Sequence, residues 1–356
     1  MFYFLIKYQQ IYKKYLVWST DLFNKLISTF EQAFNIKKFF NLKIYHSISN
    51  FQNVYRPILT TGTFDGVHLG HKIIIDRLKE IAKNQNGETV LLTFYPHPRM
   101  VLFPNDHNLQ LINTMEEKIV LLEKAGIDHL IIHPFTNDFS RTTSMKFVRD
   151  IIVNEIKTHK LVIGYNHHFG RNREGSFKHL KKYAPIYGFD VEEIPAQLID
   201  NVSISSTKIR QALLLGNVSL AANYLGYNYS FRGQVIEGQK IGRTLGFPTA
   251  NLKIVDESKL IPKDGVYAVY VEVKGQLLKG MMNIGNNPSL TFKKYSIEVH
   301  IFDFDSVIYK EQIEVRLVKR IREEISFNNL DALKIQLKKD KATAKAVLNY
   351  EKLGGV

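Results

Sequence analysis

Two histidines three residues apart, His68 and His71, lie in a glycine-bearing turn that joins a short apolar segment to a helix-forming one. Residues 57–61 (PILTT) have the composition of a buried strand, and residues 72–83 have the apolar spacing of a helix. The turn at residues 61–71 (TGTFDGVHLGH) therefore lies at a helix N-terminus, where backbone N–H groups favour anions. At positions i and i+3, both imidazoles project from one face. The pattern predicts a nucleotide-phosphate site, where the two histidines could bind the charge that develops when the α-phosphate of ATP is attacked.

Strands and helices alternate from residue 44 to about residue 205. The apolar runs predict strands at 57–61, 88–95, 129–134 and 160–164, and helices at 72–83, 114–125 and 144–156. Thr114, followed three residues later by Glu117, is a capping box at one helix start. This alternation predicts a parallel sheet covered on both faces, with ligands at the carboxyl ends of its strands, where His68 and His71 fall.

The pattern changes after a pair of helices predicted at 206–215 and 220–225. Short alternating strands are predicted at 230–236, 266–273, 276–283, 295–302 and 312–318, followed by a closing helix at 329–339. Lys274 and Gly275 form the predicted hairpin turn between two of these strands. We therefore expect three regions, namely an amino-terminal extension (1–43), an α/β domain (44–228) and a β domain (229–356).

Length and composition limit the classes of protein that fit. A chain of 356 residues is long enough for two domains, and its 45% apolar content argues against global disorder. No run approaches the roughly 18 to 20 apolar residues that a membrane-spanning helix needs. The sequence has no cysteine, which excludes disulfides, thiolate zinc sites and cysteine nucleophiles and is compatible with a reducing cytoplasm.

The formal net charge of +14 raises the question of nucleic-acid binding. Residues 1–43 contribute seven lysines against Asp21 and Glu31, and the remaining positive charge is spread along the chain. No RNA-recognition or helix-turn-helix signature is present. Enzymes that act on phosphorylated substrates also need a positive electrostatic field. The spread-out charge therefore favours phosphate-bearing small molecules over nucleic acid as ligands.

The extension has apolar residues at helical spacing, which predicts an amphipathic helix; these residues are Leu22, Phe23, Leu26, Ile27, Phe30 and Phe34. Three interpretations are open, namely a membrane-surface helix, a packing appendage, and upstream sequence translated from a misassigned start. We favour the last, because a leucine codon can also initiate translation and Leu42 could be the true beginning.

Residues 204–210 (ISSTKIR) predict a second phosphate-binding helix start in the α/β domain. Ser206 and Thr207 fit its first turn, and Arg210 lies on the same face as Thr207. Alone, the motif would be read as an ordinary N-cap followed by a surface arginine; beside the histidine turn it favours phosphate binding. In the loop at 163–175, the candidate contacts to nucleotide or substrate phosphate are Asn166, Arg171 and Arg173.

In the β domain, a glycine-bearing loop at 238–251 ends in Pro-Thr-Ala-Asn. Thr249 and Asn251 alternate along an extended chain and could face one Mg²⁺ together, although a turn closed by an asparagine side chain is the simpler interpretation. In the strand at 295–302, the period of two separates Glu298 and His300 from the apolar face. A carboxylate placed there can accept a proton from a substrate hydroxyl.

Taken in order, these motifs resemble the bifunctional bacterial riboflavin kinase and FAD synthetase family, from residue 44 to the last helix. The resemblance is carried by TGTFDGVHLGH (61–71), TFYPHP (93–98), GYNHHFG (164–170), ISSTKIR (204–210), GRTLGFPTANL (242–252), GVYAV (265–269), NIGNNPS (283–289), EVHIFDF (298–304) and IREEISF (321–327). It implies an α/β fold class, with an N-terminal Rossmann-like HxGH nucleotidyltransferase domain and a C-terminal antiparallel β-barrel riboflavin kinase domain with a closing helix.

The resemblance also implies two reactions in the cytoplasm, with Mg²⁺ as cofactor. ATP phosphorylates riboflavin to FMN, and a second ATP adenylylates FMN to FAD with release of pyrophosphate. The partners would be riboflavin, FMN and ATP, without nucleic acid or stable membrane insertion, and the sequence leaves the oligomeric state open.

By the resemblance, His68 and His71 stabilise phosphate charge in the transition state, Glu298 is the base for the ribityl hydroxyl, and Thr249 and Asn251 position Mg²⁺ and ATP. The residues that bind nucleotide and flavin would be Gly62, Phe64, Asp65, Gly70, Asn166, Arg171, Ser206, Thr207, Arg210, Gly242, Arg243, Thr249 and Asn251.

Two positions depart from the family pattern. Asn166 stands where many members have Asp, and Ser289 stands where Thr is usual. Two other functions are alternatives to this one. A class I aminoacyl-tRNA synthetase would need a lysine-bearing KMSKS-like loop, which the sequence lacks. A non-catalytic flavin sensor or membrane-tethered module is opposed by the intact set of candidate catalytic residues.

Overall fold

The computed structural model describes residues 42–52, 54–104, 109–196, 204–238, 241–286 and 295–354. The amphipathic helix predicted around residues 22–34 and the candidate Ser289 lie outside these residues. From Ile44 onward the chain forms one compact unit.

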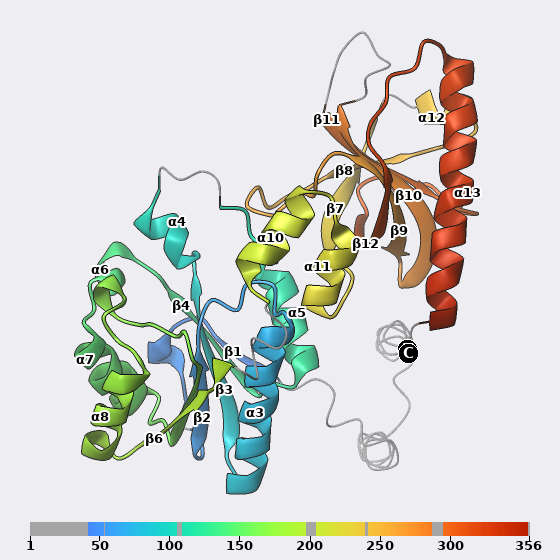
Figure 1. Cartoon of the computed structure of the whole chain (residues 1–356). Coiled ribbons are helices and arrows are strands. Elements are labelled where there is room, and N and C mark those ends of the chain that lie inside the picture. The colour runs from blue at the N-terminus through green and yellow to red at the C-terminus, as the bar shows by residue number, and fades with distance from the viewer. Residues whose placement is uncertain are drawn as a thin grey trace, which may run out of the picture. The chain divides into compact units, whose positions relative to one another are not determined.

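The first part of this unit is built on a parallel sheet with the strand order β1-β4-β3-β2-β5-β6 (Figure 1). Its strands are β1 (Lys43–Tyr45), β2 (Pro57–Thr61), β3 (Glu88–Tyr95), β4 (His129–Pro134), β5 (Lys160–Gly164) and β6 (Asp190–Ile194). Strand β2 is buried throughout and pairs in parallel with both β3 and β5. The chain runs outward from β2 through β3 to β4, and later from β5 to β6, so the strand order reverses beside β2. Such a switch point is where doubly wound sheets bind ligands.

Helices of this part connect the parallel strands. They are α3 (Leu69–Gln85), α5 (Met115–Ala125), α7 (Ser144–Lys146), the π-helix η3 (Phe147–Glu155) and α8 (Phe177–Tyr187), with the shorter η2 (Ile48–Asn50), α4 (Pro98–Leu102), α6 (Asn137–Ser140) and η4 (Arg171–Arg173). The capping box is confirmed, since the Glu117 N–H donates to the Thr114 hydroxyl at 3.3 Å and the Thr114 N–H donates to the Glu117 carboxylate at 3.1 Å. The helix predicted at 144–156 is instead one turn of α7 followed by η3. Helix α8 and strand β6 were not predicted, because α8 contains Pro185 and β6 (DVEEI) has little apolar signal.

The second part is a closed antiparallel barrel with the order β10-β11-β8-β7-β12-β9. Its strands are β7 (Ser230–Ile236), β8 (Ala250–Lys253), β9 (Gly265–Val273), β10 (Gln276–Asn286), β11 (Tyr295–Ile301) and β12 (Gln312–Arg322). Lys274 and Gly275 form the predicted hairpin turn with positive φ of 48° and 79°. Strand β8 was not predicted as a strand, although its Asn251 was expected on an extended chain. The predicted fold class is confirmed in both parts.

Helix α13 (Leu330–Gly354) lies along the barrel wall and is longer than the predicted 329–339 (Figure 1). Its Ala344 and Leu348 are fully buried in a cluster with barrel residues such as Phe302 and Val318. The Arg322 guanidinium, at the end of β12, binds the buried carboxylate of Asp340 with Nη2···Oδ2 at 2.8 Å. These contacts, beyond the predicted range, stabilise the additional turns.

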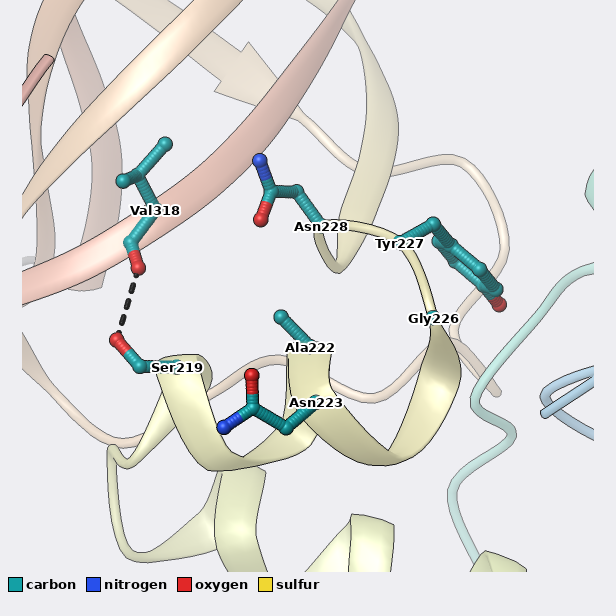
Figure 2. Close-up of a pocket in the computed structure, with 7 residues that line it drawn as sticks. All are labelled: Ser219, Ala222, Asn223, Gly226, Tyr227, Asn228 and Val318. Carbon is teal, nitrogen blue, oxygen red and sulfur yellow. Dashed lines mark hydrogen bonds between the residues drawn. The ribbon is translucent and has the colours of Figure 1, made fainter. Parts of the chain in front are cut away.

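Helices α10 (Ser206–Leu214) and α11 (Val218–Leu225) share one apolar core with the barrel. The core includes Ile209, Ala212, Leu213, Val218, Ala221 and Leu225 from the helices, and Phe231, Val269, Val299 and Val315 from the barrel strands. A pocket of about 500 Å³ adjoins α11 and β12, lined by Ser219, Ala222, Asn223, Gly226, Tyr227, Asn228 and Val318 (Figure 2). None of the predicted site residues lines this pocket. Because α10 belongs to the shared apolar core, the helix that begins with the ISSTKIR motif is supported by the barrel.

Candidate active sites

The turn after β2 brings His68 and His71 into direct contact. His68 is the N-cap of α3, and its Nδ1 accepts a hydrogen bond from the His71 backbone N–H at 3.3 Å. The two rings stack with their centroids 3.7 Å apart, and the Phe64 ring centroid lies 4.7 Å from that of His71. Because Nδ1 of His68 is an acceptor, its proton lies on Nε2, which can donate to an anion.

Burial keeps both imidazoles neutral. It lowers the pKa of His68 from 6.5 to about 4, against an opposing effect of Asp65. It also lowers the pKa of His71 well below 6.5, and the charges of His68 and Lys118 add to this effect. Nδ1 of His71 is buried without a hydrogen-bond partner among the described residues. Near pH 7 both rings are therefore neutral, so they can form hydrogen bonds but carry no positive charge.

The backbone of the turn is tightly constrained. Phe64 and Val67 have positive φ of 47° and 35°, values that non-glycine residues rarely adopt and that cluster at functional sites. The Gly62 N–H donates to the Leu92 carbonyl at 3.0 Å, and a Cβ at Gly62 would lie 3.2 Å from the Phe64 ring. Gly70 is buried in the first turn of α3. The predicted residues Gly62, Phe64 and Gly70 thus shape the turn that holds the histidines.

Asp65 and Arg210 form the second element of this site. The Asp65 carboxylate is buried and pairs with the Arg210 guanidinium, while the Ser206 hydroxyl donates to the Asp65 carbonyl at 2.9 Å. Ser205 is the N-cap of α10, and Ser206 and the exposed Thr207 lie in its first turn. The structure therefore joins the ISSTKIR motif to the histidine turn.

Two basic residues of this cluster were missed by the sequence analysis. The Lys118 ammonium is buried and donates to the Thr63 carbonyl at 2.8 Å. His97 follows β3 and belongs to the same electrostatic cluster; burial lowers its pKa to about 4, Asp65 opposes this, and Arg210 and Lys118 add to it. The TFYPHP motif contained the signal for His97, whereas nothing local marks Lys118.

The loop after β5 lies at the same end of the sheet, because β5 pairs in parallel with β2. Asn166 and Arg171 are both exposed there, and the Arg171 N–H donates to the Thr142 carbonyl at 2.7 Å. Arg173, also exposed, lies in the same loop. Within the described part of the chain, none of the three side chains forms a hydrogen bond or ion pair with the histidine turn.

A second polar site lies on the barrel. Glu298 on β11 is opposite Asn251 on β8 and Asn283 on β10, so the three residues form one row across neighbouring strands. The Thr249 hydroxyl donates to one oxygen of the Glu298 carboxylate at 3.0 Å, and the Ser296 hydroxyl donates to the other at 3.0 Å. The structure thus brings the three predicted residues Thr249, Asn251 and Glu298 together.

The loop that precedes this row approaches it closely. A Cβ at Gly238 would lie 2.1 Å from the Asn251 amide nitrogen, and one at Gly242 would lie 2.3 Å from the Phe247 carbonyl oxygen. Gly242 and the exposed Arg243 lie on the short helix α12 (Ile241–Thr244). The loop backbone can therefore pass close to Asn251 and Phe247 only because glycine occupies these positions.

The neighbouring groups extend the polar row. The Asn283 amide donates to the Glu324 carboxylate at 3.1 Å, and burial raises the pKa of Glu324. His300 shares the outer face of β11 with Glu298, as predicted, but it is buried between Phe247 and Phe302, and its Nδ1–H donates to the Pro248 carbonyl at 2.8 Å. Glu324 was missed, although IREEISF contains it.

The side-chain oxygens of this row suit a hard cation that is bound together with phosphates. Among the described residues, no group of three or more His, Cys, Asp or Glu side chains could hold a metal ion. The Thr249 hydroxyl proton is directed at Glu298, which leaves its oxygen lone pairs for a cation, and Asn251 offers an amide oxygen. Such a set fits Mg²⁺, which keeps several waters and binds through few protein oxygens and substrate phosphates.

Comparison with known proteins identifies the family of this chain. The FAD synthetase family model matches residues 51–208, and the riboflavin kinase family model matches residues 225–348. A bifunctional riboflavin kinase/FMN adenylyltransferase from Haemophilus influenzae is 39% identical over 292 residues, which cover 82% of this chain and 94% of the relative. The chain belongs to the bifunctional riboflavin kinase/FMN adenylyltransferase family. The predicted family is confirmed.

Other similar proteins match this chain over nearly the whole of their own length. The bifunctional riboflavin kinase/FMN adenylyltransferase from Escherichia coli (strain K12) is 35% identical over 314 residues, covering 87% of this chain and 99% of the relative. A crystal structure described as a macrolide-efflux protein from Streptococcus pneumoniae matches with a TM-score of 0.78 and 31% identity, covering 86% of this chain and 99% of that one. Among the described residues of this family member, no helix is both long and apolar enough to span a membrane.

Proposed function

We propose that this protein makes FAD from riboflavin in two successive reactions, each at its own site. Riboflavin and ATP give FMN and ADP, and FMN with a second ATP gives FAD and pyrophosphate. The observation that carries this proposal is that one chain contains both family matches, one spanning the His68 turn and the other spanning Glu298. We assign residues 44–228 to adenylylation and residues 229–356 to riboflavin phosphorylation.

In the adenylyltransferase site, the FMN phosphate oxygen attacks the α-phosphorus of ATP, and the bond to the pyrophosphate oxygen breaks. We assign His68 Nε2–H and His71 to donate hydrogen bonds to the phosphate oxygens as charge develops there. Arg210 and the N-terminus of α10, with Ser206 and Thr207, would hold flavin or nucleotide phosphates. The neutral, preorganised histidines suit this role, because fixed donors in a buried site stabilise developing charge without reorganisation.

The buried ion pair gives Asp65 a positioning role. Its carboxylate already accepts bonds from Arg210 and from backbone N–H groups, so it orients the guanidinium rather than binding the anionic phosphates. Lys118 adds positive charge beside the turn. Asn166 and Arg171, exposed at the end of β5, are assigned to polar contacts with the nucleotide.

In the kinase site, Glu298 accepts the proton of the terminal ribityl hydroxyl as that oxygen attacks the γ-phosphorus of ATP. Thr249 and Ser296 fix the carboxylate by donating to both of its oxygens. Thr249 and Asn251 would hold Mg²⁺, which supplies neutralisation of the ATP phosphates when bound. The loop with Gly242 and Arg243 would cover these phosphates with its backbone N–H groups and its guanidinium.

The test is chromatographic separation of flavins after incubation of the purified protein with riboflavin, ATP and Mg²⁺. The proposal predicts that FMN appears first and FAD follows, and that FMN supplied directly is also converted to FAD. Riboflavin that stays unconverted in a folded preparation would refute the proposal. We also propose that both reactions take place in the cytoplasm on free small molecules, without a nucleic-acid partner.

A further inference from the structure

A lysine from the kinase part is buried against the segment that supports the adenylyltransferase site. Lys259 follows β8 and is only 1% exposed. Its ammonium donates to the Ile112 carbonyl at 2.7 Å and to the Glu117 carboxylate, and it lies 4.6 Å from the Tyr229 ring centroid. A buried ammonium is stable only where it is paired and hydrogen-bonded, so these contacts fix its position.

The same two segments are also joined through their backbones. The Leu111 N–H donates to the Ser258 carbonyl at 2.6 Å, and the Leu260 N–H donates to the Leu111 carbonyl at 2.9 Å. Together they form a parallel bridge between Leu111 and Lys259. The Tyr229 hydroxyl donates to the Leu260 carbonyl at 2.5 Å. The lysine therefore lies inside a fixed contact rather than at the end of a mobile side chain.

The segment that this lysine holds also carries the groups that orient the adenylyltransferase residues. The backbone N–H groups of Ile112 and Asn113 donate to the Asp65 carboxylate at 3.1 and 3.2 Å. The Gln110 carbonyl accepts from Nε of Arg210 at 2.8 Å. The guanidinium of Arg210 is thus held from two directions, by Asp65 and by the segment itself.

We propose that Lys259 is a positioning residue for FMN adenylylation, although it belongs to the riboflavin kinase part of the chain. It fixes the backbone around Ile112, which sets Asp65 and Arg210 beside the histidine turn. This inference rests on the proposed role of Arg210 in binding phosphate. Loss of the ammonium leaves the Ile112 carbonyl without this donor and, among the described residues, the Glu117 carboxylate with only the Thr114 N–H, so the segment and the guanidinium shift. A displacement of about 1 Å at a reacting group costs on the order of 100-fold in rate.

The experiment measures the two reactions separately in full-length Lys259→Met. We expect FMN formation from riboflavin within about twofold of the wild type, and kcat/KM for FAD formation from FMN lowered about 10- to 100-fold. The matched control is Lys263→Met. Lys263 is a half-exposed lysine whose ammonium contacts Glu323 at 3.3 Å, and its loss should leave both rates unchanged. Adenylylation at the wild-type rate in Lys259→Met would overturn the inference.

A double-mutant cycle separates positioning from general loss of structure. In an Arg210→Ala background, Lys259→Met should lower adenylylation by less than about twofold further, because both changes act through the same guanidinium. If Lys259→Met lowers the rate of adenylylation by the same factor in the wild-type and Arg210→Ala backgrounds, the inference is contradicted. If Arg210→Ala itself adenylylates normally, the proposed phosphate-binding role of Arg210 fails; if Arg210→Ala is slow and Lys259→Met is not, only this inference fails.

A second variant guards against loss of folding. Lys259→Met with Glu117→Gln leaves no buried unpaired charge, so its stability should exceed that of Lys259→Met alone. Because the Ile112 carbonyl still lacks its donor, its adenylylation should remain slow. Full recovery of adenylylation in this pair would show that the ammonium is dispensable and would overturn the inference.

Discussion

His68 combines two roles that a pair of substitutions can separate. As the N-cap of α3, it accepts the His71 N–H through Nδ1, and it presents Nε2–H toward the phosphate site. His68→Ala removes both functions. His68→Asn keeps a side-chain oxygen at the cap, since asparagine is among the best N-cap residues, but removes the imidazole donor. We predict that His68→Asn is as stable as the wild type whereas His68→Ala is less stable, and that adenylylation is slow in both variants.

The size of each effect follows from the geometry. The cap hydrogen bond is long, at 3.3 Å, so its loss should cost about 0.5–1 kcal/mol of the free energy of unfolding, at the lower end for N-caps. Removal of a preorganised donor to a developing oxyanion costs about 100- to 1000-fold in kcat. The kinase site lies in the barrel and shares no residue with this turn. FMN formation should therefore be unchanged in both variants.

The assay follows FMN to FAD conversion, and separately riboflavin to FMN conversion, by chromatography, with urea unfolding of each variant. Recovery of adenylylation in His68→Asn to within about threefold of the wild type would show that the cap alone matters. It would refute the assignment of Nε2–H as a donor to phosphate. Loss of FMN formation in either variant would refute the independence of the two sites.

Three other predictions concern the barrel and acid stability. Glu298→Gln should lower FMN formation by about 100-fold or more while FAD formation from FMN continues, as flavin chromatography would show. Asp340→Asn removes the buried partner of Arg322 and should lower the free energy of unfolding, measured in urea, by about 3 kcal/mol. The pKa of His68 is about 4 in the folded protein and 6.5 in the unfolded chain. As the pH falls from 6.5 toward 4, the unfolded chain therefore binds a proton that the folded protein does not, and the free energy of unfolding decreases. Between pH 7 and pH 5, urea unfolding should show a decrease about 2 kcal/mol larger in the wild type than in His68→Asn.

Much of the fold was predictable because its signals are local. The apolar runs placed β2, β3 and β5 at their observed bounds, and the capping box at Thr114 placed the start of α5. Strand β6, helix α8 and the second half of α13 were missed or shortened. Strand β6 is mostly polar, α8 contains Pro185, and the second half of α13 is stabilised by contacts with the distant barrel, such as those of Ala344 and Leu348.

The available chemical groups and their order along the chain can be read without a structure, because short motifs such as the histidine turn fix the local backbone. Which of these groups meet depends on tertiary packing. Asp65 pairs with Arg210 across 145 positions, and Lys259 pairs with Glu117 across 142. Periodicity and propensity act over a few residues, whereas these pairs depend on how the sheet, the helices and the barrel pack. The same packing buries His68 and His71 and so makes them neutral donors, which no local pattern specifies.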